Sequence, residues 1–198
     1  MNKRFYNFCC VVGRPIFDLL HPAKVEGIEN LPAEGGYILC ANHLHARDPL
    51  FLALRLKARG RYVHFMAKME LFKWKPLAAV LKGLDAFPVD RGHNDLNAVR
   101  TALKVLKDGH VLGLFPQGTR SPDNSRMPML GGASMIALRA GVPVVPVFIA
   151  GPYRLFRRTP VRFGKPMTFE DLGRRMDGET IAQATQRIED AVWSMRED

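Results

Sequence analysis

Residues 96–121 read LNAVRTALKVLKDGHVLGLFPQGTRS and contain a helix signal, a cap and a strand signal in close succession. Gly109 is a typical C-terminal helix cap, and the apolar run at 111–115 predicts a strand buried on both faces. A helix followed by a buried strand in this way is typical of α/β folds. Before Gly109, apolar residues recur at steps of three and four on one predicted helical face: Leu96, Val99, Leu103 and Leu106.

Working outward from this stretch, strand and helix signals alternate along the rest of the chain. No internal repeat, low-complexity tract or long polar linker interrupts the alternation. We therefore expect a single-domain α/β sandwich over residues 23–198, with a largely parallel mixed sheet flanked by helices, after an amphipathic segment at 1–22. Strands are expected at 24–27, 36–42, 62–67, 143–151 and 160–164, and helices at 48–57, at 133–140 and around Ile181, Ile188, Val192 and Met195.

Composition narrows the class of protein. The chain has 198 residues, of which 47% are apolar, which fits one domain with a sizeable core and excludes disordered and fibrous chains. Its 3 cysteines cannot form a disulfide framework or a Cys-rich zinc site, which favours a reducing compartment. The net charge of +10 predicts a polyanionic partner: nucleic acid, an anionic membrane or a phosphorylated substrate.

The first 22 residues resemble a signal peptide only in part. Lys3 and Arg4 precede an apolar stretch, but Gly13 and Arg14 end it and no small-residue cleavage site follows. Because no run approaches the ~18 apolar residues of a spanning helix, we expect neither export nor a transmembrane segment. Two alternatives stay open, a helix lying in an anionic membrane interface or a helix packed on its own domain. Either would use the helical face of Phe5, Phe8, Val12, Ile16 and Leu19.

Polar side chains follow two of the expected strands. Loops at the carboxyl ends of parallel strands carry the chemistry of such sheets, so His43, Asp48 and Arg120 converge if the two strands are neighbours. The segment AFPVDRG, at 86–92, would add Arg91 to the same edge. The first strand gives Asn42, His43, His45, Arg47 and Asp48, and the second gives Gln117, Gly118, Thr119, Arg120 and Ser121.

These residues can deprotonate a hydroxyl group beside a phosphate. A neutral imidazole is the natural general base near pH 7, and a carboxylate on its other nitrogen fixes the tautomer. Arginines supply bidentate donors for a phosphate. Since Ser134 lies in GGASMIA and no GxSxG elbow occurs, a covalent serine enzyme is disfavoured. The nucleophile would then be the substrate's own hydroxyl.

Each residue also has a structural alternative. Asp48 followed by Pro49 and an apolar run fits an ordinary helix N-cap. His43 taken alone could be a structural histidine, and Gly118 could simply allow a turn. Arg91 or Arg120 alone fits a solvated cation.

Four blocks in a fixed order carry a family resemblance. They are NHLHARD (42–48), AFPVDRG (86–92), FPQGTRS (115–121) and VPVVPV (142–147), and AKMELF (67–72) adds a fifth segment. Together they resemble the glycerophospholipid acyltransferase family, particularly its bacterial 1-acylglycerol-3-phosphate acyltransferases with their NHxxxxD motif. The similarity runs from about Lys24 to about Lys165.

The resemblance implies transfer of a fatty acyl group from acyl-CoA or acyl carrier protein to the free hydroxyl of lysophosphatidate, which makes phosphatidate. No cofactor or metal is implied. The expected partners are these substrates and an anionic membrane surface, not nucleic acid, and the expected location is the cytoplasmic face of the cell membrane, held peripherally. Glycerol 3-phosphate or another lysolipid is the alternative acceptor.

The same resemblance implies roles for individual residues. His43 would be the general base and Asp48 its orienting partner. Arg91 would hold the acceptor phosphate. Five further residues would assist in substrate binding: Arg120, Lys68, Gln117, Gly118 and Thr119.

The third block departs from the family pattern at Gln117, where the family has glutamate. Glutamine keeps the length and an acceptor oxygen but loses the charge, and we expect the enzyme to stay active. The stretch MPMLGGASM, at 127–135, also lacks a lysine that is common in the family.

Two rival functions remain. His43, His45 and Asp48 have metal-ligand chemistry and could serve a metal-dependent hydrolase, although Arg47 would repel a cation. The cluster YRLFRR, at 153–158, mixes aromatic residues with cations and suits a non-enzymatic basic module that binds a membrane or single-stranded nucleic acid.

Overall fold

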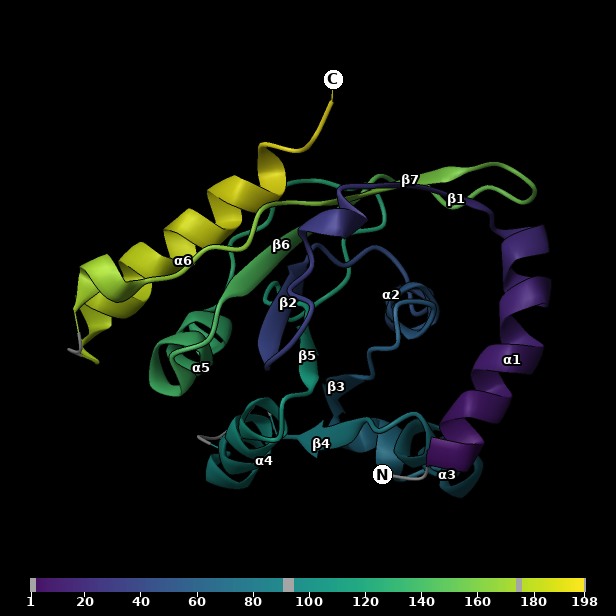
Figure 1. The fold of residues 1–198 in the computed structure, drawn as a ribbon, viewed down its shortest axis with the longest axis horizontal. Helices are drawn as coiled ribbons and strands as arrows, with labels where there is room; N and C mark the ends of the chain where they lie inside the picture. The colour runs from purple at the N-terminus through teal and green to yellow at the C-terminus, as the bar shows by residue number, and fades with distance from the viewer. Residues whose placement is uncertain (1–2, 91–94, 174–175, 198) are drawn as a thin grey trace.

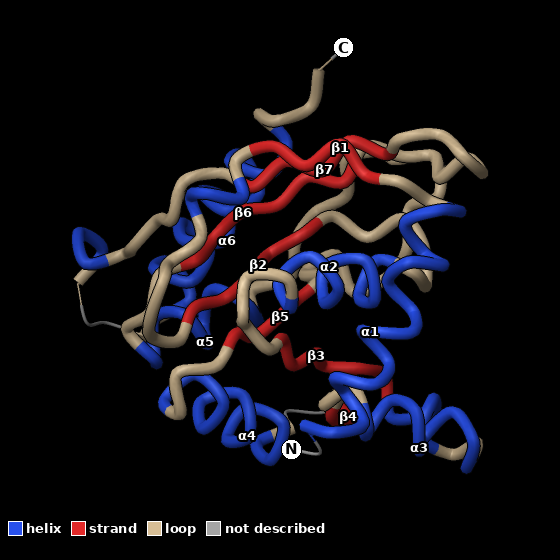
Figure 2. Tube along the Cα trace, turned by 45° about the vertical axis from the view of Figure 1, so that its right-hand side comes forward, coloured by secondary structure: helices blue, strands red, loops and turns tan. Residues whose placement is uncertain are grey.

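A single mixed sheet organises the computed structural model, which describes residues 3–90, 95–173 and 176–197 (Figure 1). In this part of the chain the seven strands have the order β1-β7-β6-β2-β5-β3-β4, which Figure 2 shows from top to bottom. β2 to β6 are parallel, whereas β7 is antiparallel to β6 and parallel to β1. The expected largely parallel mixed sheet is confirmed. The strands are β1 (Ala23–Glu26), β2 (Tyr37–Ala41), β3 (Val63–Lys68), β4 (Phe87–Val89), β5 (Val111–Leu114), β6 (Val144–Ile149) and β7 (Thr159–Phe163).

Helices cover both faces of the sheet. α1 and α2 lie on one side, and α4, α5 and α6 lie on the other (Figure 1). The helices are α1 (Lys3–Leu20), α2 (Asp48–Lys57), α3 (Lys75–Gly83), α4 (Leu96–Lys107), α5 (Gly132–Ala140) and α6 (Gly178–Trp193). Short 3-10 helices span Ile28–Asn30, Met69–Phe72 and Glu170–Leu172.

The central strand β2 shows why a sheet with two covered faces needs continuous apolar runs. Tyr37, Leu39 and Ala41 pack on the side of α1 and α2. Ile38 and Cys40 pack on the side of α4 to α6. Every residue of β2 is therefore buried, as expected for a parallel strand between two helical layers.

Two local expectations were wrong or incomplete. The predicted apolar face of α4 is rotated, because Leu96 is 59% exposed and the buried face is formed by Ala98, Ala102, Val105 and Leu106. Asp95 caps the helix through the amide of Ala98 at 2.9 Å, which places Leu96 in the outward-facing first turn. The sequence patterns also missed α3, which buries only Ala78 among its nine residues.

α1 packs on its own domain, but through a face other than the predicted one. Tyr6, Cys10 and Phe17 pack into the core. On the outer face four of the five predicted residues are exposed, Phe8 by 63%, Val12 by 46%, Ile16 by 56% and Leu19 by 68%. Phe5 differs because its half-buried ring lies against Gly83 of α3. Among the described residues, no helix is both long and apolar enough to cross a bilayer.

Candidate active site

The loops after β2 and β5 meet because these two strands are neighbours in the sheet. The amide of His43 donates to Oε1 of Gln117 at 2.7 Å. The amide of Ser121 donates to the carbonyl of His43 at 2.8 Å. The loop at 117–121 thus holds the backbone of His43 from both sides. The expected meeting of the first and third blocks is correct.

Asn42 fixes the start of the first loop. Its side chain is buried, its Nδ2 donates to the carbonyl of Ile149 at 2.9 Å, and its Oδ1 accepts from the amide of Ile149 at 2.7 Å. A third bond joins Nδ2 to Oδ1 of Asn124 at 2.9 Å. Asn42 therefore ties the end of β2 to the end of β6, immediately before His43.

His43 and Asp48 form a short hydrogen-bonded pair. Nδ1 of His43 lies 2.7 Å from Oδ2 of Asp48, whose side chain is 0% exposed. The same Oδ2 accepts from the amides of Leu44 at 2.7 Å and His45 at 2.9 Å. Because an ionised carboxylate only accepts, Nδ1 carries the proton and Nε2 is the nitrogen that can receive one. This is the geometry of an oriented general base.

The N-cap alternative for Asp48 is wrong. Asp48 is the first residue of α2, and its carboxylate turns back to the amides of the preceding loop. Its second oxygen, Oδ1, accepts from the hydroxyl of Tyr153 at 2.8 Å. Burial, and then the negative charge of Asp48, raise the pKa of Tyr153, so its phenol stays a proton donor.

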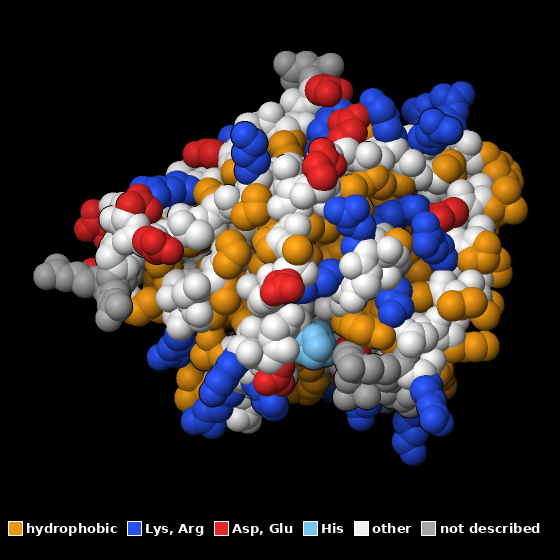
Figure 3. Space-filling view, in the orientation of Figure 1, with side chains coloured by type: hydrophobic (Ala, Val, Ile, Leu, Met, Phe, Trp, Pro, Cys, Tyr) orange, Lys and Arg blue, Asp and Glu red, His pale blue; other side chains and the backbone are white. Residues whose placement is uncertain are grey.

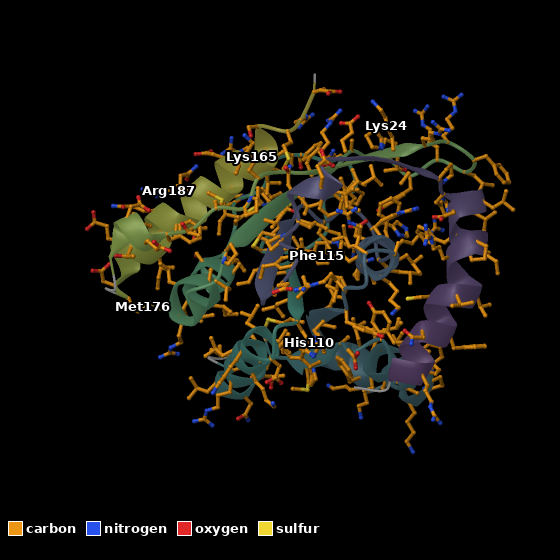
Figure 4. The ribbon with its side chains drawn as sticks, viewed as in Figure 1. Lys24, His110, Phe115, Lys165, Met176 and Arg187 are labelled. Atoms are coloured by element: carbon orange, nitrogen blue, oxygen red, sulfur yellow. The ribbon has the colours of Figure 1, made fainter. Side chains whose placement is uncertain are left out.

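An aromatic ring supports the imidazole. Phe115 stacks on His43 with 4.2 Å between ring centroids and 24° between ring planes. Figure 4 shows Phe115 near the middle of the molecule. Phe65 of β3 stacks in turn on Phe115, with 6.0 Å between the two ring centroids. Packing thus fixes the plane of the His43 ring, while its side chain remains 17% exposed.

Two of the three expected phosphate-binding cations, Arg120 and Lys68, lie on the surface of the molecule. Arg91 lies outside the described residues. Arg120 and Thr119 are exposed in the loop after β5. Lys68 ends β3 at the same edge of the sheet, where its exposed ammonium lies 3.3 Å from Glu70. The structure therefore joins His43, Asp48 and Gln117 directly and leaves Arg120 and Lys68 on the surrounding rim.

Gly118 and Gln117 shape the loop between these groups. Gly118 has φ of +71°, and an added Cβ would lie 3.0 Å from Leu130, so the turn favours glycine. Gln117 is only 6% exposed. In the described part of the chain, its Nε2 is buried with no hydrogen-bond partner. The chain thus has a buried amide donor at position 117, where the family pattern has a carboxylate oxygen.

The donor set does not suit a metal-dependent hydrolase. Both oxygens of Asp48 already accept from protein donors, and Nδ1 of His45 lies 3.2 Å from the amide of Arg47. Over the described ranges, no three His, Cys, Asp or Glu side chains gather as a metal site would require. Arg47 also donates to Nε2 of His21 at 2.9 Å, which keeps a cation beside the loop.

Sequence reasoning missed Tyr153 and Phe115 as parts of this site. Tyr153 was assigned to a surface cluster, yet its ring is half-buried and its hydroxyl reaches Asp48. The neighbouring residues of the cluster are exposed as expected. Phe115 was predicted only as the end of a buried strand. The apolar character of each ring was visible, but the contact with the site depends on tertiary packing.

Known proteins share both the sequence pattern and the fold. A family model described as acyltransferase matches residues 22–150. The chain is 32% identical over 192 residues to the 1-acyl-sn-glycerol-3-phosphate acyltransferase of Bacillus subtilis (strain 168), which covers 94% of each protein. It is 32% identical over 174 residues to the protein of the same name in Streptococcus pneumoniae (strain ATCC BAA-255 / R6), covering 84% of this chain and 63% of that one.

A solved structure agrees with these relatives. The crystal structure of the 1-acyl-sn-glycerophosphate (LPA) acyltransferase PlsC from Thermotoga maritima matches with a TM-score of 0.71 and 27% identity, covering 100% of this chain and 81% of that one. These similarities favour the enzyme over a non-enzymatic basic module. The chain belongs to the acyltransferase family.

Proposed function

We propose that this acyltransferase transfers a fatty acyl group from an acyl-CoA or acyl carrier protein thioester to the free hydroxyl of lysophosphatidate, making phosphatidate. The observation that carries the proposal is the 2.7 Å bond between Nδ1 of His43 and the buried carboxylate of Asp48. The names of the relatives in Bacillus subtilis and Streptococcus pneumoniae support this acceptor. His43 is the general base and Asp48 its orienting partner.

In the proposed reaction, no covalent acyl-enzyme forms. Nε2 of His43 takes the proton of the acceptor hydroxyl while the oxygen attacks the thioester carbonyl carbon. The tetrahedral intermediate collapses, the carbon–sulfur bond breaks, and the imidazolium returns its proton to the leaving thiolate. Asp48 stabilises the imidazolium during this exchange and keeps its ring oriented.

The acceptor phosphate is assigned to the cationic rim. Arg120 and Lys68 are exposed at the same sheet edge as His43, and Arg91 is proposed as the main phosphate ligand although it lies outside the described residues. Guanidinium groups bind phosphate through paired donors. Gly118 and Thr119 shape the loop that presents Arg120.

The proposed location is the cytoplasmic face of the cell membrane, where anionic lipids attract basic segments. The exposed apolar face of α1 supports interfacial binding, and Figure 3 shows hydrophobic side chains along this edge of the molecule. The basic segment at 154–158 adjoins it, since the amide of Phe156 donates to the carbonyl of Leu20 at 2.8 Å. Leu155 and Phe156 are 55% and 63% exposed between the arginines of this segment.

An acceptor and donor panel tests the proposed reaction. Purified protein is incubated with acyl-CoA or acyl-loaded carrier protein and with lysophosphatidate, glycerol 3-phosphate or neutral lysolipids, and products are identified by mass spectrometry. We expect phosphatidate from lysophosphatidate and a loss of about 10³-fold or more in the His43→Ala variant. Normal turnover by His43→Ala would overturn the assigned mechanism. Preference for another acceptor would overturn the assigned substrate.

Vesicle sedimentation tests the membrane surface. Because burial of one large apolar side chain contributes about 1.5–3 kcal/mol, Phe8→Ser with Ile16→Ser should weaken binding to anionic vesicles by at least about tenfold. The matched control is Leu96→Ser, since Leu96 is similarly exposed but lies on α4, in the opposite layer. Equal loss of binding in both variants, or binding that does not fall as salt rises, would contradict this assignment.

A further inference from the structure

We propose that Tyr153 is a positioning residue for the His43–Asp48 pair, because its hydroxyl holds the second oxygen of Asp48. This inference rests on the proposed role of the pair as general base. Tyr153 comes from the segment after β6 and lies 105 residues away from Asp48 in the sequence, so only the fold brings them together.

The two oxygens of Asp48 have different partners. Oδ2 faces Nδ1 of His43 and the amides of Leu44 and His45. Oδ1 accepts from Tyr153 at 2.8 Å. A carboxylate buried away from water needs donors at both oxygens. The hydroxyl of Tyr153 therefore stabilises the ionised carboxylate and opposes the rotation that would move Oδ2 off His43.

Aromatic packing holds the Tyr153 ring in place. Phe51 of α2 meets it edge to face, with 5.9 Å between centroids. His21, just after α1, and His45, in the catalytic loop, each lie 6.1 Å away by the same measure. Three separate segments thus fix a side chain with few rotatable bonds, so its hydroxyl is oriented before substrate binds.

The chemical consequence concerns the imidazolium formed during the reaction. Asp48 must stay ionised and aligned on Nδ1 at that moment. Without the phenol, Oδ1 would be a buried acceptor lacking its donor, and the carboxylate could turn. Hydrogen bonds to charged groups are among the stronger ones. Loss of this bond should therefore slow the chemical step and leave substrate binding unchanged.

The test compares Tyr153→Phe with the wild-type enzyme on the best acceptor found in the panel. Phenylalanine keeps the ring and removes only the hydroxyl. We expect kcat to fall by about 10- to 100-fold, with KM for donor and acceptor changed by less than about twofold. The downfield proton resonance of His43 Nδ1 should weaken or move in the NMR spectrum. The control is Tyr37→Phe, a fully buried tyrosine at the opposite end of β2.

A second comparison separates positioning from simple stabilisation. In an Asp48→Asn background, Tyr153→Phe should cost less than about twofold in kcat, because the two residues act through one bond. The inference is overturned if Tyr153→Phe keeps kcat within about twofold of wild type, if it costs as much in the Asp48→Asn background, or if the NMR resonance is unmoved. Failure of the proposed function would appear separately, as full activity in His43→Ala.

Discussion

The two halves of the candidate site, the loop of His43 and Asp48 and the rim of cations, are built in opposite ways. Asp48 is 0% exposed, and both of its oxygens accept from protein donors. Lys68 is 54% exposed, and Arg120 is exposed in its loop. A general base must be oriented before the reaction, whereas an exposed cation gains order from the phosphate it binds. Under the proposed mechanism, the comparison separates a preorganised proton-transfer half from a phosphate-binding half that substrate completes.

The largest expected effect is on the preorganised half. Asp48→Asn keeps the shape of the side chain but offers an amide that cannot stabilise the imidazolium. We expect kcat to fall by about 10³- to 10⁴-fold, as for the equivalent change in serine-protease triads. Steady-state kinetics with lysophosphatidate measures this. Asp171→Asn is the control, because Asp171 forms an exposed ion pair with Arg187. Less than a tenfold loss, on the order of one missing hydrogen bond, would contradict the preorganised role.

A smaller effect should separate the cationic rim from the base. Arg120→Ala removes the proposed donor pair for phosphate, so KM for lysophosphatidate should rise by about tenfold while kcat changes little. The control is Arg139→Ala in the last turn of α5. KM should be measured at two salt concentrations. The KM values of wild type and variant should converge at high salt, because salt screens the charge of Arg120. A fall in kcat with KM unchanged would show that Arg120 acts in the chemical step with His43 and Asp48, and would contradict the division into two halves.

Acidic pH should lower the stability of the folded protein through His64, which lies outside both halves of the site. The half-buried His64 of β3 has its pKa lowered by burial, and then by nearby His110, from 6.5 to about 4. Between pH 6.5 and about pH 4 the unfolded chain binds more protons than the folded one. The free energy of unfolding therefore falls as pH falls. Allowing for partial exposure, we expect the free energy of unfolding to be about 1 kcal/mol lower at pH 5 than at pH 7.

Chemical denaturation of wild type and His64→Gln at both pH values measures this difference. The variant should lose a large part of the pH dependence, because position 64 no longer titrates, and His21, whose pKa is also lowered by burial, should account for part of the remainder. An unchanged pH dependence of stability in His64→Gln would show that another group is responsible.

Much of the preorganised half could be predicted from sequence, because its signals are local. Alternating strand and helix patterns place the loops of His43 and Gln117 on one sheet edge, and their backbones do meet. The Asp–Pro pattern at 48–49 could not separate an N-cap from an orienting carboxylate, since both begin a helix. Tyr153 was out of reach, because a polar aromatic among arginines has the same local pattern whether it lies outside or packs inward.

The apolar periodicities show the same limit. On α4 the pattern selected Leu96, but close packing against the sheet uses the small Ala98 and Ala102. On α1 one face could be identified, but the second face of Tyr6, Cys10 and Phe17 could not, because Gly13 interrupts its apolar repeat. Local spacing describes what a helix can bury, and tertiary contacts decide what it does bury.

The smallest expected effect is at Gln117, which links the two halves. Its Oε1 accepts from the amide of His43 at 2.7 Å, and a glutamate oxygen can do the same. Gln117→Glu should therefore change kcat by less than about tenfold, since the backbone contact that orients His43 is kept. Gln117→Leu is the comparison, because it leaves the His43 amide without its acceptor and should cost more. If Gln117→Glu instead raised kcat by several orders of magnitude, the missing carboxylate charge would belong to the catalytic half, and the hydrogen bonds around Asp48 would not be sufficient for an active site.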